Sequence, residues 1–151
     1  MAYAAQSAYR DSEVLNASPE RLVQIVYDIA VRSIASARQC VENKDIPGRV
    51  RHINTAFSAL VELNTGLDFE AGKEIAQNYA RIYDYCQRRL VEGNVRQDDA
   101  ILAEVQSLIG DLQEAWQIVV TRVSAERTAE FAAGAHFASQ HAEDGSLSVV
   151  G

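Results

Sequence analysis

The chain has 151 residues, which fits a single domain that can bury a core without metal ions or disulfides. Its formal net charge of -7 argues against nucleic acid as the main partner, because a protein that binds the phosphate backbone needs a cationic face. Only two prolines, together with many Ala, Leu, Ile, Val, Glu and Arg residues, indicate an all-α protein.

The chain begins with a small, polar stretch that contains Tyr3 and Tyr9 and shows no sustained helical period. We therefore expect a flexible N-terminal arm over residues 1–17. Ser18 is a favourable helix N-cap, and Pro19 is favourable at the first helical position, so the first helix should begin there. The polar turn that starts at Asn43 should end it.

A second helix is predicted to begin near Gly48, because the residue before a proline is biased away from helix. Ile53 and Phe57 lie on its apolar face. Gly66 should end this helix in a left-handed conformation, and residues 67–72 should form the link to a third helix.

The third and fourth helices carry apolar stripes that recur every three or four residues. The stripe residues are Ile75, Tyr79, Ile82, Cys86 and Leu90 on the third helix, and Leu102, Val105, Ile109, Leu112 and Trp116 on the fourth. A short turn at residues 93–97 should separate the two helices, with Asp98 as the cap of the fourth helix and its end near Arg127. Short links make neighbouring helices antiparallel, so the pattern predicts an antiparallel up-and-down four-helix bundle.

The resulting domain organisation has three parts. These are an arm at residues 1–17, a bundle domain at 18–127 and an Ala-rich tail at 128–151. We expect the tail to be mostly disordered, although residues 129–138 could extend the last helix.

No pattern of catalytic or metal-binding residues stands out, so we expect no enzymatic activity, no metal and no cofactor. The inward-facing Glu-x-x-His pairs of di-metal bundles do not occur, and neither Cys40 nor Cys86 has a histidine nearby in the sequence. Both cysteines lie beside apolar residues and read as reduced and buried, which favours the cytosol. No apolar run approaches the roughly 20 residues that a membrane span needs, and the first ten residues do not resemble a signal peptide.

Tyrosines crowd two turns of the third predicted helix, at Tyr79, Tyr83 and Tyr85. A single buried stripe on this helix does not require three tyrosines. Tyr79 and Tyr83 either seal the edge of the bundle or offer rigid, amphipathic contact area to a partner helix, and composition does not separate the two readings.

Several separated segments point to a known family. They are residues 74–85 (EIAQNYARIYDY), 88–98 (RRLVEGNVRQD) and 17–22 (ASPERL), with Ala8 and Tyr9, Tyr27 and Asp28, Leu67 and Asp68, and residues 112–116 (LQEAW). In order and spacing they closely resemble the FliS family of flagellar export chaperones, from about Ala8 to Val123. The departures are Ile82, where the family usually has Leu, and Gly93, where it often has Ala.

The resemblance implies a cytosolic chaperone that binds flagellin before its export through the flagellar type III apparatus and prevents premature polymerisation. In that family the disordered C-terminal region of flagellin becomes helical around the bundle, and the chaperone's arm covers part of the same surface until displaced. We expect a free monomer that forms a 1:1 complex, with export gate components or a co-chaperone as candidates for further partners. The alternative is a regulatory or scaffold bundle that binds another amphipathic segment.

The candidate flagellin contacts are four positions on the second and third helices and one in the arm. On the helices they are Ile53, Phe57, Tyr79 and Tyr83, with the rival interpretation that all four complete the core. Tyr9 has no apolar stripe of its own, so we expect it to plug the groove in the free protein.

Overall fold

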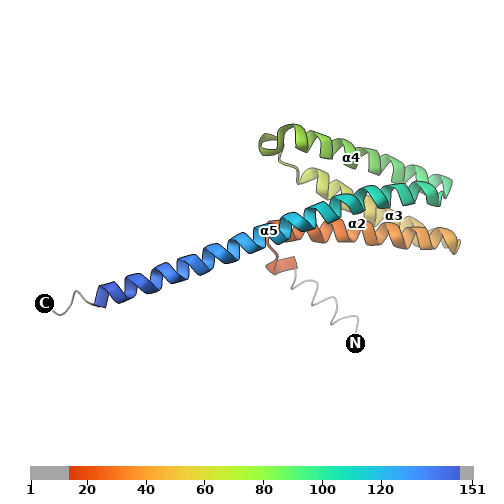
Figure 1. The fold of residues 1–151 in the computed structure, drawn as a ribbon. Helices are drawn as coiled ribbons and strands as arrows, with labels where there is room; N and C mark the ends of the chain where they lie inside the picture. Colours follow the sequence, from red (N-terminus) through yellow and green to blue (C-terminus); the bar gives the residue numbers. More distant parts are fainter. Residues whose placement is uncertain (1–13, 147–151) are drawn as a thin grey trace, which may run out of the picture. The chain divides into compact units, whose positions relative to one another are not determined.

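The computed structural model describes residues 14–146, and within this range four long helices and no strand occur. The helices are α2 (Pro19–Glu42), α3 (Ile46–Thr65), α4 (Phe69–Arg96) and α5 (Asp99–Ser146). The chain falls into two units, Met1–Trp116 and Gln117–Gly151. The first unit holds the bundle, in which α2, α3, α4 and the first part of α5 lie alongside one another (Figure 1).

Hydrogen bonds between helices show how they are paired. Arg49 near the start of α3 bonds Asn94 near the end of α4 at 2.9 Å, so these two helices are antiparallel. Arg38 near the end of α2 donates a hydrogen bond to Asp99 at the start of α5. Further along α5, the Trp116 indole donates to the main-chain oxygen of Glu20 at the start of α2. These pairs run in opposite directions along the two helices, and the predicted antiparallel up-and-down bundle is confirmed.

The most extensive backbone contact between two helices is between α2 and α3. Several residues buried in these two helices have short side chains, and we call them the small-residue seam: Ala30, Ser33 and Ala37 on α2, and Gly48, Ala56 and Ala59 on α3. Short side chains let helix backbones approach closely. The rest of the core is filled by larger residues from all four helices, of which Ile34, Leu60, Leu90, Leu102, Val105 and Ile109 are fully buried. Each such side chain stabilises the fold by about 1.5–3 kcal/mol.

The helix starts follow from capping residues. The Ser18 hydroxyl accepts from the Arg21 amide at 3.3 Å, and Asp98 accepts from the Ala100 amide at 2.9 Å, so both predicted caps are confirmed. The start of α3 differs from the prediction, because Asp45 is its N-cap and the helix begins at Ile46 rather than near Gly48.

The other end of α3 also differs. Gly66 caps it with φ -77°, which is not left-handed, so that prediction is wrong. Within the predicted link of residues 67–72, Asp68 accepts from the Glu70 and Ala71 amides and starts α4 at Phe69, but Lys73 is non-helical, so α4 consists of two helical segments joined by a kink at that residue.

The predicted turn at residues 93–97 is wrong as well, because α4 continues through Arg96. Gly93 is a buried helical residue, and a Cβ atom there would lie 2.8 Å from a methyl group of Leu102. The glycine therefore lets α5 approach α4 closely instead of stopping the helix. The actual stop is Gln97, which adopts a left-handed conformation with φ 53°.

The last helix is longer than predicted, since α5 runs to Ser146 and does not end near Arg127. Residues 128–146 are helical, so the prediction of a mostly disordered tail is wrong, and the alternative that residues 129–138 extend the last helix is confirmed. The physical reason is their composition, which is rich in alanine, the best helix former, and contains no proline. The division into arm, bundle domain and tail at residues 17 and 127 stays a prediction, and residues 1–13 of the arm lie outside the described range.

Candidate functional site: an apolar pocket in the bundle

A pocket of about 240 Å³ opens in the first unit where parts of all four helices meet. We call it the apolar pocket. Its lining comes from Leu22, Val23, Val26 and Tyr27 of α2, Glu62 and Leu63 of α3, Gly66 and Leu67 of the following link, Tyr79 and Tyr83 of α4, and Trp116 of α5. Apolar and aromatic side chains dominate this lining, and Glu62 is its one charged residue. Such a composition suits an apolar side chain of a partner better than a polar metabolite.

Two tyrosines form the floor of the apolar pocket, since Tyr27 and Tyr83 line it and are each only 2% exposed. Their hydroxyl oxygens lie 2.5 Å apart and share a hydrogen bond that joins α2 to α4. Burial raises the pKa of both hydroxyls, so both remain protonated at neutral pH. The ring of Tyr79 lies 6.1 Å from that of Tyr83, in a tilted arrangement.

The rim of the apolar pocket is partly open to solvent. Leu22 is 37% exposed although it is a large apolar residue in the first turns of α2. Trp116 in the same lining is half-buried, and its indole Nε1 donates to the main-chain oxygen of Glu20 at 2.9 Å. This bond satisfies the indole N–H and fixes the ring, so a rigid aromatic wall faces any occupant.

A strained residue lies between two parts of the pocket lining. Lys73, between Leu67 and Tyr79 in the chain, has φ 45° and ψ -121° inside α4. For a residue with a side chain such a conformation costs on the order of 1–3 kcal/mol. Phe69 and Ile75 on either side of it are 51% and 67% exposed, so this end of α4 presents apolar side chains to solvent.

The five predicted site residues fall in different places. Tyr79 and Tyr83 both line the apolar pocket. Ile53 is 3% exposed in the core and Phe57 is partly buried against it, and neither lines the pocket. Tyr9 lies outside the described residues. The prediction that these residues contact a partner is not decided by their positions.

Sequence reasoning missed the contributions of α2 and α5 to this pocket. Leu22, Val26 and Trp116 belong to regular apolar stripes, and a stripe does not show where its neighbouring helices stop covering it. The sequence did contain a signal for this position of the pocket. Leu22 lies in the first turns of one helix and Trp116 at the end of the predicted stripe of an antiparallel neighbour, so the two residues fall at the same end of the bundle.

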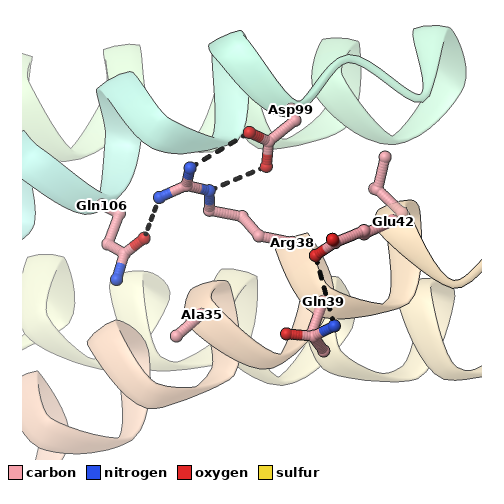
Figure 2. A pocket seen from close by; sticks show the side chains of 7 residues that line it. Ala35, Arg38, Gln39, Glu42, Asp99 and Gln106 are labelled. Carbon is pink, nitrogen blue, oxygen red and sulfur yellow. Dashed lines mark hydrogen bonds and ion pairs between the residues drawn. The ribbon is translucent and has the colours of Figure 1, made fainter.

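A second, polar pocket of about 500 Å³ lies on the other half of the α2–α5 contact. There the Arg38 guanidinium reaches from α2 to both carboxylate oxygens of Asp99, at 2.7 and 3.0 Å, and to the Gln106 side chain at 2.8 Å (Figure 2). The hydrogen bond from Arg38 holds the pKa of Asp99 below its ordinary value. Because the groups satisfy one another, this site reads as a tie between the two helices.

A third cluster joins α4 to α5. Glu104 accepts hydrogen bonds from the Tyr85 hydroxyl and from Arg89, which also pairs with Glu92 at 2.7 Å. The bond from Tyr85 contributes most to a lowered pKa of Glu104. Tyr85, one of the three crowded tyrosines, is thus engaged on another face and does not line the apolar pocket.

Within residues 14–146, no three His, Cys, Asp or Glu side chains come together as a metal site would require. None of the helices in the same range has an apolar stretch long enough to cross a bilayer. Asp84 and Arg88 form an exposed ion pair on α4, at 3.3 Å.

Comparison with known proteins gives one consistent result. The family described as "Flagellar protein FliS" matches residues 1–123. The flagellar secretion chaperone FliS of Salmonella typhimurium is 34% identical over 115 residues, which covers 76% of this chain and 85% of that protein. FliSB of Pseudomonas aeruginosa is 34% identical over 106 residues, or 70% and 84% of the two chains.

The FliS chaperone of Bacillus subtilis is 32% identical over 111 residues, which covers 74% of this chain and 82% of that relative. The relatives bear the name of chaperones, and no catalytic family is indicated. The resemblance in the sequence motifs, the helical bundle and these matches agree, and the chain belongs to the FliS family of flagellar secretion chaperones.

Proposed function

We propose that this chain acts in the cytosol, binds the disordered C-terminal region of flagellin, prevents its premature polymerisation and supports its export through the flagellar type III apparatus. The family membership supports a chaperone of flagellar secretion. The apolar pocket is the observation that supports a protein segment as the partner, because closing the pocket would increase the stability of a bundle that bound nothing. An amphipathic segment that folds into a helix against such a surface is a recurring mode of recognition.

The pocket itself is too small to hold a helix. Its volume of about 240 Å³ suits one or two large apolar side chains, which would anchor the segment. Apolar residues outside the pocket, above all Phe69 and Ile75, would extend the contact along the start of α4. An extended contact is needed because a segment that folds on binding must offset its loss of conformational entropy.

Among the predicted contacts, we propose that Tyr79 and Tyr83 face the bound segment through the pocket that they line. Ile53 and Phe57 would take part only if the partner extends over α3 or displaces side chains that cover them. In the free protein, Tyr9 of the arm would cover the same surface.

The test of this function compares two forms of flagellin from the same organism. The chain is mixed with intact flagellin or with flagellin that lacks its C-terminal region, and the mixtures are examined by size-exclusion chromatography with light scattering. We expect a 1:1 complex with the intact form only, together with an increase in helical circular dichroism. Equal binding of the truncated form would contradict the proposal and favour a bundle that serves another segment.

The arm is tested separately with Tyr9→Ala. If Tyr9 competes for the same surface, its loss alters flagellin affinity, measured by isothermal titration calorimetry, and leaves the melting temperature nearly unchanged. Tyr3→Ala is the matched control in the same arm. Unchanged affinity of Tyr9→Ala would remove the arm from the mechanism and leave the pocket proposal in place.

A further inference from the structure

The floor of the apolar pocket contains more hydrogen-bonding capacity than it uses. Tyr27 and Tyr83 carry two hydroxyl protons, and the hydrogen bond between them uses one. Among residues 14–146 neither hydroxyl has another hydrogen-bond partner. Within residues 14–146 the remaining proton therefore has no acceptor, in a pocket lined mainly by apolar and aromatic side chains with Glu62 as its one charged residue.

We propose that this tyrosine pair selects the segment that enters the pocket, by donating a hydrogen bond to a side-chain oxygen of that segment. The inference rests on the proposed function and adds to it the chemistry of the occupant. The bound helix would carry one Ser, Thr, Asn or Gln among the apolar residues that face the bundle, opposite Tyr27 and Tyr83.

The physical basis is the cost of covering an unpaired polar group. A wholly apolar helix would seal the spare proton away from water without a partner, whereas a helix with a suitably placed oxygen satisfies it. Sites that hydrogen-bond a ligand reject analogues without the matching group for this reason. Raised pKa values keep both hydroxyls protonated, so the donor is present throughout the neutral range.

The rival explanation is that the pair only ties α2 to α4. The two explanations predict different results for the double variant Tyr27→Phe with Tyr83→Phe. Replacing both partners of a buried hydrogen bond by apolar groups of the same shape is nearly neutral for stability, so the variant should fold. A single replacement is less informative, because the remaining hydroxyl is still able to donate to the occupant.

The experiment measures binding of a peptide with the sequence of the flagellin C-terminal region, by calorimetry. We expect the double variant to bind about tenfold more weakly than the wild-type chain, equivalent to about 1.4 kcal/mol. Tyr85→Phe is the matched control, since Tyr85 also lies on α4 but bonds Glu104 and does not line the pocket, and it should change affinity by less than about twofold. Equal or tighter binding by the double variant would overturn the inference.

A second measurement uses the wild-type chain and changes the peptide. Each Ser, Thr, Asn and Gln is replaced in turn by Ala. One replacement should weaken binding to the wild-type chain about tenfold and leave binding to the double variant unchanged. If no position behaves in this way, the inference fails. If the wild-type chain does not bind the unmodified peptide at all, the proposed function fails instead, and the two failures are thereby distinguished.

Discussion

The small-residue seam and the apolar pocket are two regions of one bundle that share helix α2. After Tyr27, the buried residues of α2 are Ala30, Ser33, Ile34 and Ala37, of which all but Ile34 are short, and the backbone contact of α2 with α3 is the most extensive between two helices. Around the pocket, α2 presents Leu22, Val26 and Tyr27, and a cavity of about 240 Å³ remains between the helices. Side-chain size along one helix thus decides where the bundle is sealed and where it is open to a partner.

The largest expected effect comes from overfilling the seam. Ala56 is fully buried in α3, and Ala56→Leu forces three additional carbons between closely packed helices. We expect the free energy of unfolding to fall by about 1–3 kcal/mol in urea denaturation. Ala35→Leu, on an exposed position of α2, is the control and should change it by less than about 0.5 kcal/mol. Similar losses for both variants would mean that the seam is no more tightly packed than the surface.

A smaller and opposite effect is expected at Lys73, the strained residue of α4. Glycine adopts positive φ without a steric penalty, so Lys73→Gly should raise the free energy of unfolding by about 1 kcal/mol after its own entropic cost. Lys73→Ala removes the same charge but keeps the strained conformation, so it should not stabilise the protein. Thermal and urea unfolding of the two variants check this. A stabilisation of equal size by alanine would assign the effect to charge rather than backbone.

The next expected effect is on binding more than on stability. Leu22→Ala shortens a pocket residue that is already partly exposed, so it should cost less than about 1 kcal/mol of stability and weaken flagellin binding about threefold to fivefold. Ile29→Ala is the matched control, because Ile29 is a similarly exposed residue of α2 that does not line the pocket. If both variants bind equally well, the rim of the pocket does not contribute to recognition.

The smallest expected effect concerns pH and the tie between Arg38 and Asp99. The pKa of Asp99 is lowered in the folded state, so the pair stabilises the protein above the ordinary carboxyl pKa of about 3.9, and this stabilisation is lost as pH falls through the folded value. Both groups are substantially exposed, which limits the contribution to a few tenths of a kcal/mol.

Asp99→Asn should therefore be slightly less stable than the wild-type chain at pH 7 and equal to it near pH 2. Urea denaturation at the two pH values measures the difference. A constant difference between the two proteins at both pH values would show that the carboxylate charge is not its source.

The helices were predictable because their signals are local. The apolar period and the capping side chains of Ser18 and Asp98 depend on a few neighbouring residues. Gly93 was misread because glycine has two physical uses, freedom of the backbone and absence of a side chain, and only the position of Leu102 on another helix shows that the second applies. The end of α5 was predicted too early because the stretch after Arg127 is rich in Ala, Gly, Ser and His, a composition that suggests disorder, although alanine favours helix.

The candidate site was less predictable, since it depends on how the helices end relative to one another. Tyr79 and Tyr83 were predicted and both line the pocket, but the position of the pocket at Leu22 and Trp116 was not. An apolar residue has the same periodicity whether or not another helix covers it. Likewise, no sequence pattern placed the hydroxyl of Tyr27 beside that of Tyr83, which lies 56 positions further along the chain.

The burial of Cys86 makes this residue a reporter of transient opening of the bundle. Its thiol is fully buried in α4, and burial raises the pKa of Cys86 to about 11, so at neutral pH it is neither accessible nor ionised. Alkylation of this sulfur requires helices to separate. With the partly exposed Cys40 replaced by Ser, the rate at which Cys86 is alkylated under native conditions reports how often the bundle opens. A bound segment that holds the helices together should lower this rate.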